Sequence, residues 1–289
     1  MSNALIIVGD NRQTLKTLDA QSVQTVITSP PYWGLRDYGQ EDQIGLEVSP
    51  EDYVEQLCLV FDEVWRVLKD DGTLWLNLGD TYVGSGSKGS LVDPKQPEGR
   101  NGQAIAMNNK VSGLKPKDMI GIPWRVALAL QARGWYLRQD IIWAKPNPMP
   151  EPVLDRCTKS HEYIFLMSKS PKYFFDNKAI AEPVADSGDK SNPDTRNKRD
   201  VWTVAPSRYK EAHFATYPPE LILPCVLAGS KANDLILDPF SGSGTTGEVA
   251  MSKGRNYLGL ELNPEYALMS EKRLIDACGL FGTVEVRNG

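Results

Sequence analysis

Short apolar runs alternate with longer amphipathic stretches along most of the chain. Residues 4–8 and 23–28 are almost entirely apolar and rich in β-branched side chains, which is typical of strands buried on both faces of a sheet. The polar segment between them has room for one short helix over residues 12–18. Runs of the same kind predict further strands at residues 73–78, 136–143, 162–167, 234–238 and 256–261.

The stretches between these runs have helical periodicity. Ser49-Pro50-Glu51-Asp52 provides an N-cap and an acidic first turn for a helix that continues to Leu68, and Asp71-Gly72 is predicted to end it. Strands that alternate with helices predict a doubly wound α/β sheet, here as a single domain over residues 1–289. The other predicted helices cover residues 122–133, 219–228, 245–252 and 264–278.

Two polar segments interrupt this alternation. Residues 82–117 contain six basic and two acidic residues, a local charge of +4 that leaves −9 for the rest of the chain, and we expect a mobile basic loop there. Residues 178–212 carry a second basic cluster interleaved with aromatic residues. Loops of this length are more often functional or disordered than merely connecting. The cluster consists of Arg196, Lys198, Arg199, Trp202, Arg208, Tyr209 and Lys210.

Composition narrows the class of protein. With 289 residues, 41% apolar and 24% charged, the chain is neither disordered nor a disulfide scaffold, and the net charge of −5 argues against a surface that is basic throughout. No apolar run approaches the ~20 residues of a membrane span, and the start of the chain lacks a basic signal region, so a cytoplasmic protein is expected. Four scattered cysteines and two histidines support neither a metal site nor a disulfide framework.

A glycine-rich loop follows the strand predicted at residues 234–238. Asp238 ends this strand, and Gly242 and Gly244 open the next helix, where they would let the backbone approach a ligand. No lysine follows Gly244, which excludes a P-loop. A dinucleotide fingerprint would need Gly247 as its third glycine, and this alternative is not preferred here. Glu261, 17 residues beyond Gly244, ends the next strand, where a carboxylate can hold a ribose diol. An adenosyl ligand without phosphates fits this pattern best.

A second motif, Ser29-Pro30-Pro31-Tyr32-Trp33, follows the strand at residues 23–28. The two prolines fix the backbone, so that the Ser29 hydroxyl and the Pro30 carbonyl form rigid acceptors beside two aromatic rings. An exocyclic base amine is a poor nucleophile because its lone pair is conjugated into the ring, and such acceptors would draw the nitrogen toward a tetrahedral shape. Tyr32 and Trp33 could stack on the base. A polyproline-type surface turn is the alternative interpretation of this motif alone.

Together the two motifs resemble those of the beta-class amino-group DNA methyltransferases, which methylate exocyclic amines of cytosine or adenine with S-adenosylmethionine. In that class the [DNS]PP[YF] motif precedes the cofactor loop, as Ser29-Pro30-Pro31-Tyr32 precedes Asp238 here, and the resemblance covers nearly the whole chain. It implies a circularly permuted Rossmann-like methyltransferase sheet, mostly parallel with one antiparallel edge hairpin. It also implies catalytic roles for residues 29–32 and a cofactor site made of Asp10, Phe214, Thr216, Asp238, Phe240, Gly242, Gly244, Thr245, Thr246 and Glu261.

The same resemblance implies a substrate and partners. Ser29 in place of Asp is similar to the subgroup that methylates cytosine N4, with adenine N6 as the alternative. The substrate would be duplex DNA with the target base flipped out, in a restriction-modification setting where a cognate endonuclease is a further candidate partner. Residues 178–212 would hold the target-recognition region. The predicted DNA contacts are Trp33, Arg196, Lys198, Arg199, Arg208 and Lys210.

Other activities are weaker interpretations of this chain. Pro224-Cys225 formally offers the nucleophile of a cytosine-5 enzyme, but it lies in an apolar helical run. His161 and His213 are not assigned proton transfer. RNA and protein methyltransferases usually have the opposite motif order, and a non-catalytic DNA-binding module would not need both motifs.

Overall fold

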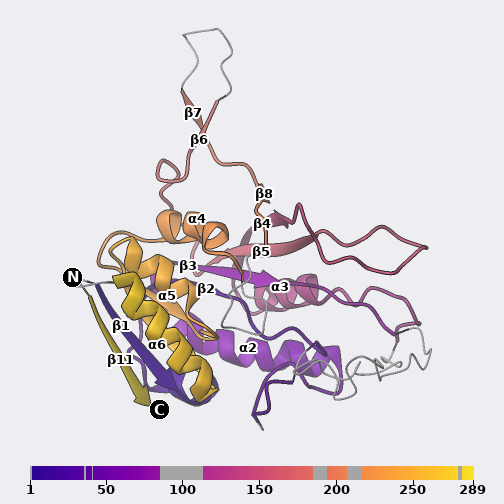
Figure 1. Cartoon of the computed structure of the whole chain (residues 1–289), viewed down its shortest axis with the longest axis horizontal. Coiled ribbons are helices and arrows are strands. Elements are labelled where there is room, and N and C mark those ends of the chain that lie inside the picture. Colours follow the sequence, from indigo (N-terminus) through magenta and orange to yellow (C-terminus); the bar gives the residue numbers. More distant parts are fainter. Residues whose placement is uncertain are drawn as a thin grey trace.

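The computed structural model describes residues 2–35, 37–40, 42–84, 113–184, 194–206, 217–278 and 282–289. In these ranges one large sheet forms the centre of the molecule (Figure 1). Its strands are β1 (Ser2–Val8), β2 (Val23–Thr28), β3 (Leu68–Leu78), β4 (Tyr136–Ala144), β5 (His161–Ser168), β8 (Val201–Thr203), β9 (Leu235–Asp238), β10 (Asn256–Glu261) and β11 (Gly282–Asn288). They lie in the order β11-β1-β10-β9-β2-β3-β5-β4-β8.

Helices cover both faces of this sheet (Figure 1). One core cluster packs α2 and α3 against one face, and a second packs α4, α5 and α6 against the other. Ser49 caps α2 as predicted, its side chain accepting from the amide of Asp52 at 3.1 Å. The helices are α1 (Asn11–Thr14), continued by the 3₁₀ turn Leu15–Thr17, then α2 (Pro50–Val67), α3 (Ile122–Ala132), α4 (Pro219–Gly229), α5 (Thr245–Ser252) and α6 (Pro264–Cys278).

Strand direction confirms the permuted, mostly parallel sheet. The strands from β11 to β3 are parallel neighbours, and β5 runs antiparallel between β3 and β4. The β4–β5 hairpin is not itself the edge, because β8 pairs in parallel with β4 beyond it. Since β5 is reversed, its first residues lie beside the carboxyl ends of the parallel strands, where ligands bind in sheets of this type.

The structure differs from the sequence-based prediction at the end of α2 and in its last strand. Helix α2 ends at Val67, and Asp71-Gly72 lies within β3, where a Cβ on Gly72 would be 2.6 Å from Leu68 Cγ. Strand β11 was not predicted at all, because its alternating Gly-Thr-Val-Glu-Val-Arg pattern gives one exposed strand and no buried run. It extends the sheet by pairing with β1.

The two polar segments are described only in part. Residues 85–112 of the predicted basic loop lie outside the described ranges. Its first residue, Tyr82, forms a bridge with Met119, just beyond its end. In the second segment, β6 (Glu182–Pro183) and β7 (Thr195–Arg196) form a short antiparallel pair that projects from the body of the molecule (Figure 1). None of the helices in the described ranges has the length and apolarity needed to cross a membrane.

Candidate active site

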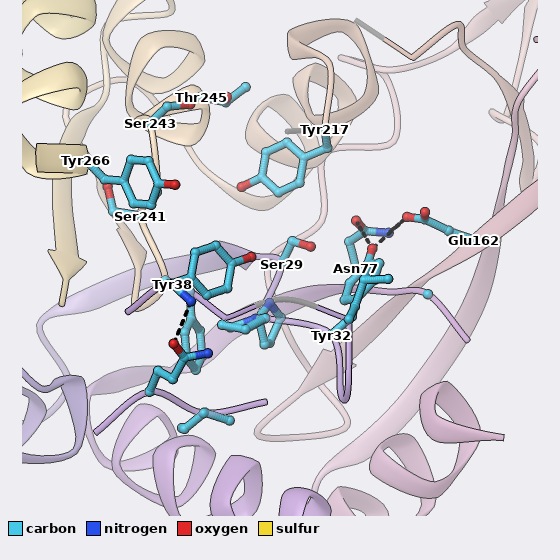
Figure 2. Close-up of a pocket in the computed structure, with 18 of the residues that line it drawn as sticks. Ser29, Tyr32, Tyr38, Asn77, Glu162, Tyr217, Ser241, Ser243, Thr245 and Tyr266 are labelled. Carbon is cyan, nitrogen blue, oxygen red and sulfur yellow. Dashed lines mark hydrogen bonds between the residues drawn. The ribbon is translucent and has the colours of Figure 1, made fainter. Parts of the chain in front are cut away.

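A single cavity of about 570 Å³ joins the two motifs singled out in the sequence. It lies beyond the carboxyl ends of β1, β2, β3, β9 and β10, together with the start of β5. Figure 2 shows Ser29 between two groups of side chains, one around Tyr38 and Tyr266 and the other around Tyr32 and Glu162. The predicted residues that line the cavity are Asp10, Ser29, Pro30, Pro31, Tyr32, Phe240, Gly242, Thr245 and Glu261.

The Ser-Pro-Pro-Tyr turn is fixed by contacts to α2 and the segment before it. The Tyr53 hydroxyl donates to the Pro31 carbonyl at 2.8 Å, and the Trp33 indole donates to the Glu47 carbonyl at 3.0 Å. Trp33 is only 3% exposed and packs in the core. Its predicted contact with DNA is therefore corrected: a buried indole that anchors the turn cannot stack on a base without leaving its place.

Tyr32 forms a rigid wall of the cavity. Its hydroxyl donates to Glu162 Oε2 at 2.7 Å and lies 3.2 Å from Asn77 Oδ1 (Figure 2). Glu162 is also paired with Lys145. Burial, reinforced by the Glu162 carboxylate, raises the pKa of Tyr32 well above its ordinary value. Gly79 permits the contact, because a Cβ there would lie 2.6 Å from the Tyr32 ring. Tyr32 thus stays protonated, as an anchored ring rather than a base.

The two glycines of the cofactor loop have different roles. Gly242, with φ +52°, lines the cavity and donates its amide to Glu261 Oε2 at 2.7 Å. Gly244, with φ +79°, does not line it: a Cβ there would lie 2.3 Å from Ser270 Oγ in α6. The packing of α6 on the loop therefore requires this glycine, and its approach to a ligand stays a prediction.

Asp238 is a buried hub rather than part of the cavity wall. Its carboxylate accepts from the Thr28 hydroxyl at 2.6 Å, the Thr246 hydroxyl at 2.7 Å, the Phe240 amide at 3.0 Å and the Tyr217 hydroxyl at 3.1 Å. Burial raises its pKa despite these donors. Asp238 and Thr246 therefore hold β2, α5 and the segment just before α4 together behind the cavity.

Glu261 and Asp10 are carboxylates at the cavity wall. Glu261 accepts from the amides of Gly242 and Asn263, and burial raises its pKa to about 7. The Leu262 amide is a third backbone donor to this carboxylate. Since a carboxylate offers about four acceptor positions, about one remains for a ligand. Asp10 caps α1 by accepting from the amide of Arg12 and forms an ion pair with its guanidinium at 3.0 Å.

Several cavity residues were not identified from the sequence. The rings of Tyr38 and Tyr266 pack edge to face beside the glycine loop, with 6.2 Å between their centroids. Tyr217 faces them across the cavity (Figure 2). Asn77 and Asp80, at the end of β3, could have been found by applying to this strand the strand-end rule used for β2 and β9. Phe214 and Thr216 lie outside the described residues.

Three of the residues predicted to contact DNA interact with other side chains of the protein. Arg196 and Arg199 both donate to Glu182 Oε1, at 3.0 and 2.5 Å, and the ammonium of Lys198 lies over the Trp202 ring at 5.1 Å. All three cations sit on or next to the projecting β6–β7 pair. Arg208 and Lys210 lie outside the described residues, and the contacts of this segment with DNA stay a prediction.

A permuted α/β sheet with a glycine loop and an SPPY turn facing one cavity defines an amino-group DNA methyltransferase. The profile of the N6/N4 DNA methylase family matches residues 23–272, and the chain belongs to that family. Type II methyltransferases M.Cfr9I of Citrobacter freundii and M.SmaI of Serratia marcescens are 50% and 49% identical to it. The matches extend over 275 and 271 residues, covering 95% and 93% of this chain and 88% and 90% of theirs.

Solved structures agree with this assignment. The Thermus thermophilus protein TTHA0409, complexed with S-adenosyl-L-methionine, matches with a TM-score of 0.65 and 26% identity over 99% of both chains. The cytosine-N4-specific PvuII DNA methyltransferase has a similar fold, with a TM-score of 0.69 and 20% identity over 99% of this chain and 95% of its own. The protein is an S-adenosylmethionine-dependent DNA methyltransferase.

Proposed function

We propose that this enzyme methylates the exocyclic N4 amine of cytosine in duplex DNA, with the base extruded into the cavity beside Ser29. The observation that carries the proposal is the single cavity in which the Ser29 turn and the Glu261 side of the glycine loop face each other. The amine of a paired cytosine is inside the duplex, so the base must leave the stack to reach this cavity. Ser29 in place of an acidic residue favours cytosine. The likeness to the PvuII enzyme concerns the fold and does not carry the choice of base.

The cofactor side of the cavity fits an adenosyl group. Phe240 offers an aromatic wall, and the Glu261 carboxylate has acceptor capacity left for a ribose hydroxyl. Gly242 lines the cavity beside them, with a left-handed backbone that favours glycine. A volume of about 570 Å³ is in the range of ligand pockets that accept a nucleoside-sized molecule together with a second group. When bound, S-adenosylmethionine supplies an electrophilic methyl group with a good leaving group.

On the opposite side, residues of the SPPY turn hold the base amine. The Ser29 hydroxyl and the Pro30 carbonyl accept from the two amine hydrogens, which draws the nitrogen lone pair out of conjugation. Tyr32, anchored through Glu162, packs on the base ring. The role of the protein in this proposal is to orient the amine and exclude water, and the surplus amine proton leaves through Ser29 or solvent.

Analysis of the methylated base tests this proposal. DNA from a host without its own methyltransferases, expressing this protein, is digested to nucleosides and analysed by mass spectrometry. We expect N4-methylcytosine as the product, and sequencing of modified bases in the same DNA would give the recognition site. N6-methyladenine as the major product would overturn the choice of base without changing the family.

The raised pKa of Glu261 predicts a pH-dependent cofactor affinity. Ribose hydroxyls donate to the ionised carboxylate, so affinity should rise about tenfold from about pH 6 to about pH 8 and level off above the pKa of about 7. The stability of the fold should have the opposite pH dependence. Because the pKa of Glu261 is raised in the folded protein, this residue stabilises the fold at low pH, and its contribution is lost as pH rises through about 7.

Calorimetry of cofactor binding across this pH range provides the check. Glu261→Gln should bind weakly with little pH dependence, whereas Glu265→Gln, an exposed neighbour in α6, should behave as wild type. A wild-type affinity that does not change with pH would remove Glu261 from the ribose site.

A further inference from the structure

One lysine in the cavity has a buried amino group that no hydrogen bond accounts for. Lys159 precedes β5 by two residues and lines the same cavity as Ser29 and Tyr32. Its Nζ is buried and has no hydrogen-bond partner among the residues that the structure describes. Unpaired buried donors are costly and rare in native proteins, and one in a ligand cavity indicates that a ligand completes its bonding.

The surroundings of Lys159 place its amino group on the base side of the cavity. The charges acting on it come from Asp80, Glu151, Glu162 and Lys145, all in or next to β3 and the β4–β5 connection. Glu162 is the residue that anchors Tyr32. The cofactor loop contributes none of these neighbours.

The nearby carboxylates attract Lys159 but are bonded to other groups. Asp80 Oδ1 accepts from the amides of Gly121 and Ile122 at 3.0 Å, where it caps α3. Glu151 Oε2 pairs with Arg156 at 2.5 Å. Glu162 is shared by Lys145 and the Tyr32 hydroxyl. Burial lowers the pKa of Lys159 while the carboxylates oppose this shift. The amino group is therefore held in place by charge, with its donors left for another acceptor.

We propose that Lys159 is a specificity-determining residue that donates a hydrogen bond to the O2 carbonyl of the extruded cytosine. This inference rests on the proposed function. With its amine at Ser29, cytosine presents two adjacent acceptors, N3 and O2, along the same edge. Adenine presents N1 followed by a C–H group, so it leaves the Lys159 donor unpaired. A donor at this place selects cytosine over adenine by the penalty of an unsatisfied buried group.

The test uses a synthetic duplex with the recognition site found in the host DNA. A matched duplex carries the C-nucleoside of 2-aminopyridine at the target position, which keeps the amine and ring nitrogen of cytosine but lacks O2. Lys159→Met should lower kcat/KM on the cytosine duplex about 10- to 100-fold, the range for loss of one charged hydrogen bond. On the analogue, Lys159→Met should have a kcat/KM equal to or above that of wild type, because the variant has no buried donor to leave unpaired.

A lysine needed only for folding would lower kcat/KM on both duplexes alike, and this outcome would overturn the inference. Lys253→Met, at an exposed site at the end of α5 away from the cavity, is the matched control and should discriminate as wild type does. Measurements of cofactor affinity and of thermal unfolding show whether Lys159→Met is correctly folded.

Product analysis separates this inference from the proposed function. N4-methylcytosine with unchanged discrimination in Lys159→Met contradicts the lysine alone, whereas N6-methyladenine contradicts the choice of base.

Discussion

Replacing Ser29 by alanine is expected to slow methyl transfer about 100-fold while leaving the affinities for cofactor and DNA nearly unchanged. The hydroxyl acts mainly as the amine becomes tetrahedral, so its loss raises the barrier without weakening the ground-state complex. The magnitude is that of removing one preorganised hydrogen-bonding group from an active site. Single-turnover rates at saturating cofactor and DNA measure the chemical step directly.

Two further variants make the Ser29 result specific. Ser29→Asn keeps an acceptor at the same place and should lose less activity than Ser29→Ala. Ser252→Ala removes a hydroxyl at the far end of α5 and should have no effect on the rate. A Ser29→Ala enzyme with near-normal single-turnover rates would exclude this side chain from the mechanism and leave the Pro30 carbonyl as the acceptor.

The sequence predicted the parts of the fold that depend on local pattern. Apolar runs mark the buried strands, and the two motifs directly follow β2 and β9, so their place at one edge of the sheet follows from the strand pattern alone. Strand β11 was not predicted because its pattern is that of an exposed strand, and its partner, β1, is at the other end of the chain. Long-range pairing of this kind leaves no local signal.

Residues whose role depends on tertiary contacts were misjudged or missed. Trp33 looked like a stacking surface, yet a carbonyl of Glu47 and the core of α2 enclose it. Gly244 fits a ligand loop by its motif, but its lack of a side chain is required by Ser270 in α6. Glu162 and Lys159 enter the site only because β5 runs antiparallel, which brings the start of that strand to the carboxyl ends of its neighbours.

Tertiary contacts also decide the role of Asp238. Among the variants considered, replacement of this residue should cause the largest loss of stability. A residue at the end of a strand before a glycine loop is expected to touch the ligand. In the structure, its carboxylate accepts from four donors, which come from β2, α5, the segment just before α4 and the loop itself. Asp238→Ala would leave these buried donors without an acceptor, and we expect a decrease in the free energy of unfolding of about 3–5 kcal/mol.

Denaturant unfolding without cofactor measures this loss apart from any effect on binding. Asp234→Ala, just before β9, removes a partly exposed carboxylate that pairs with Lys69 at 3.5 Å and accepts from the Lys231 amide at 2.8 Å. This change should cost about 1 kcal/mol. A double-mutant cycle with Thr28→Val should show coupling, because the Thr28 hydroxyl donates to the carboxylate that Asp238→Ala removes. Asp238→Ala could instead unfold as wild type does and lose only cofactor affinity. That result would show that the carboxylate contacts the ligand directly and that its four hydrogen bonds contribute little to stability.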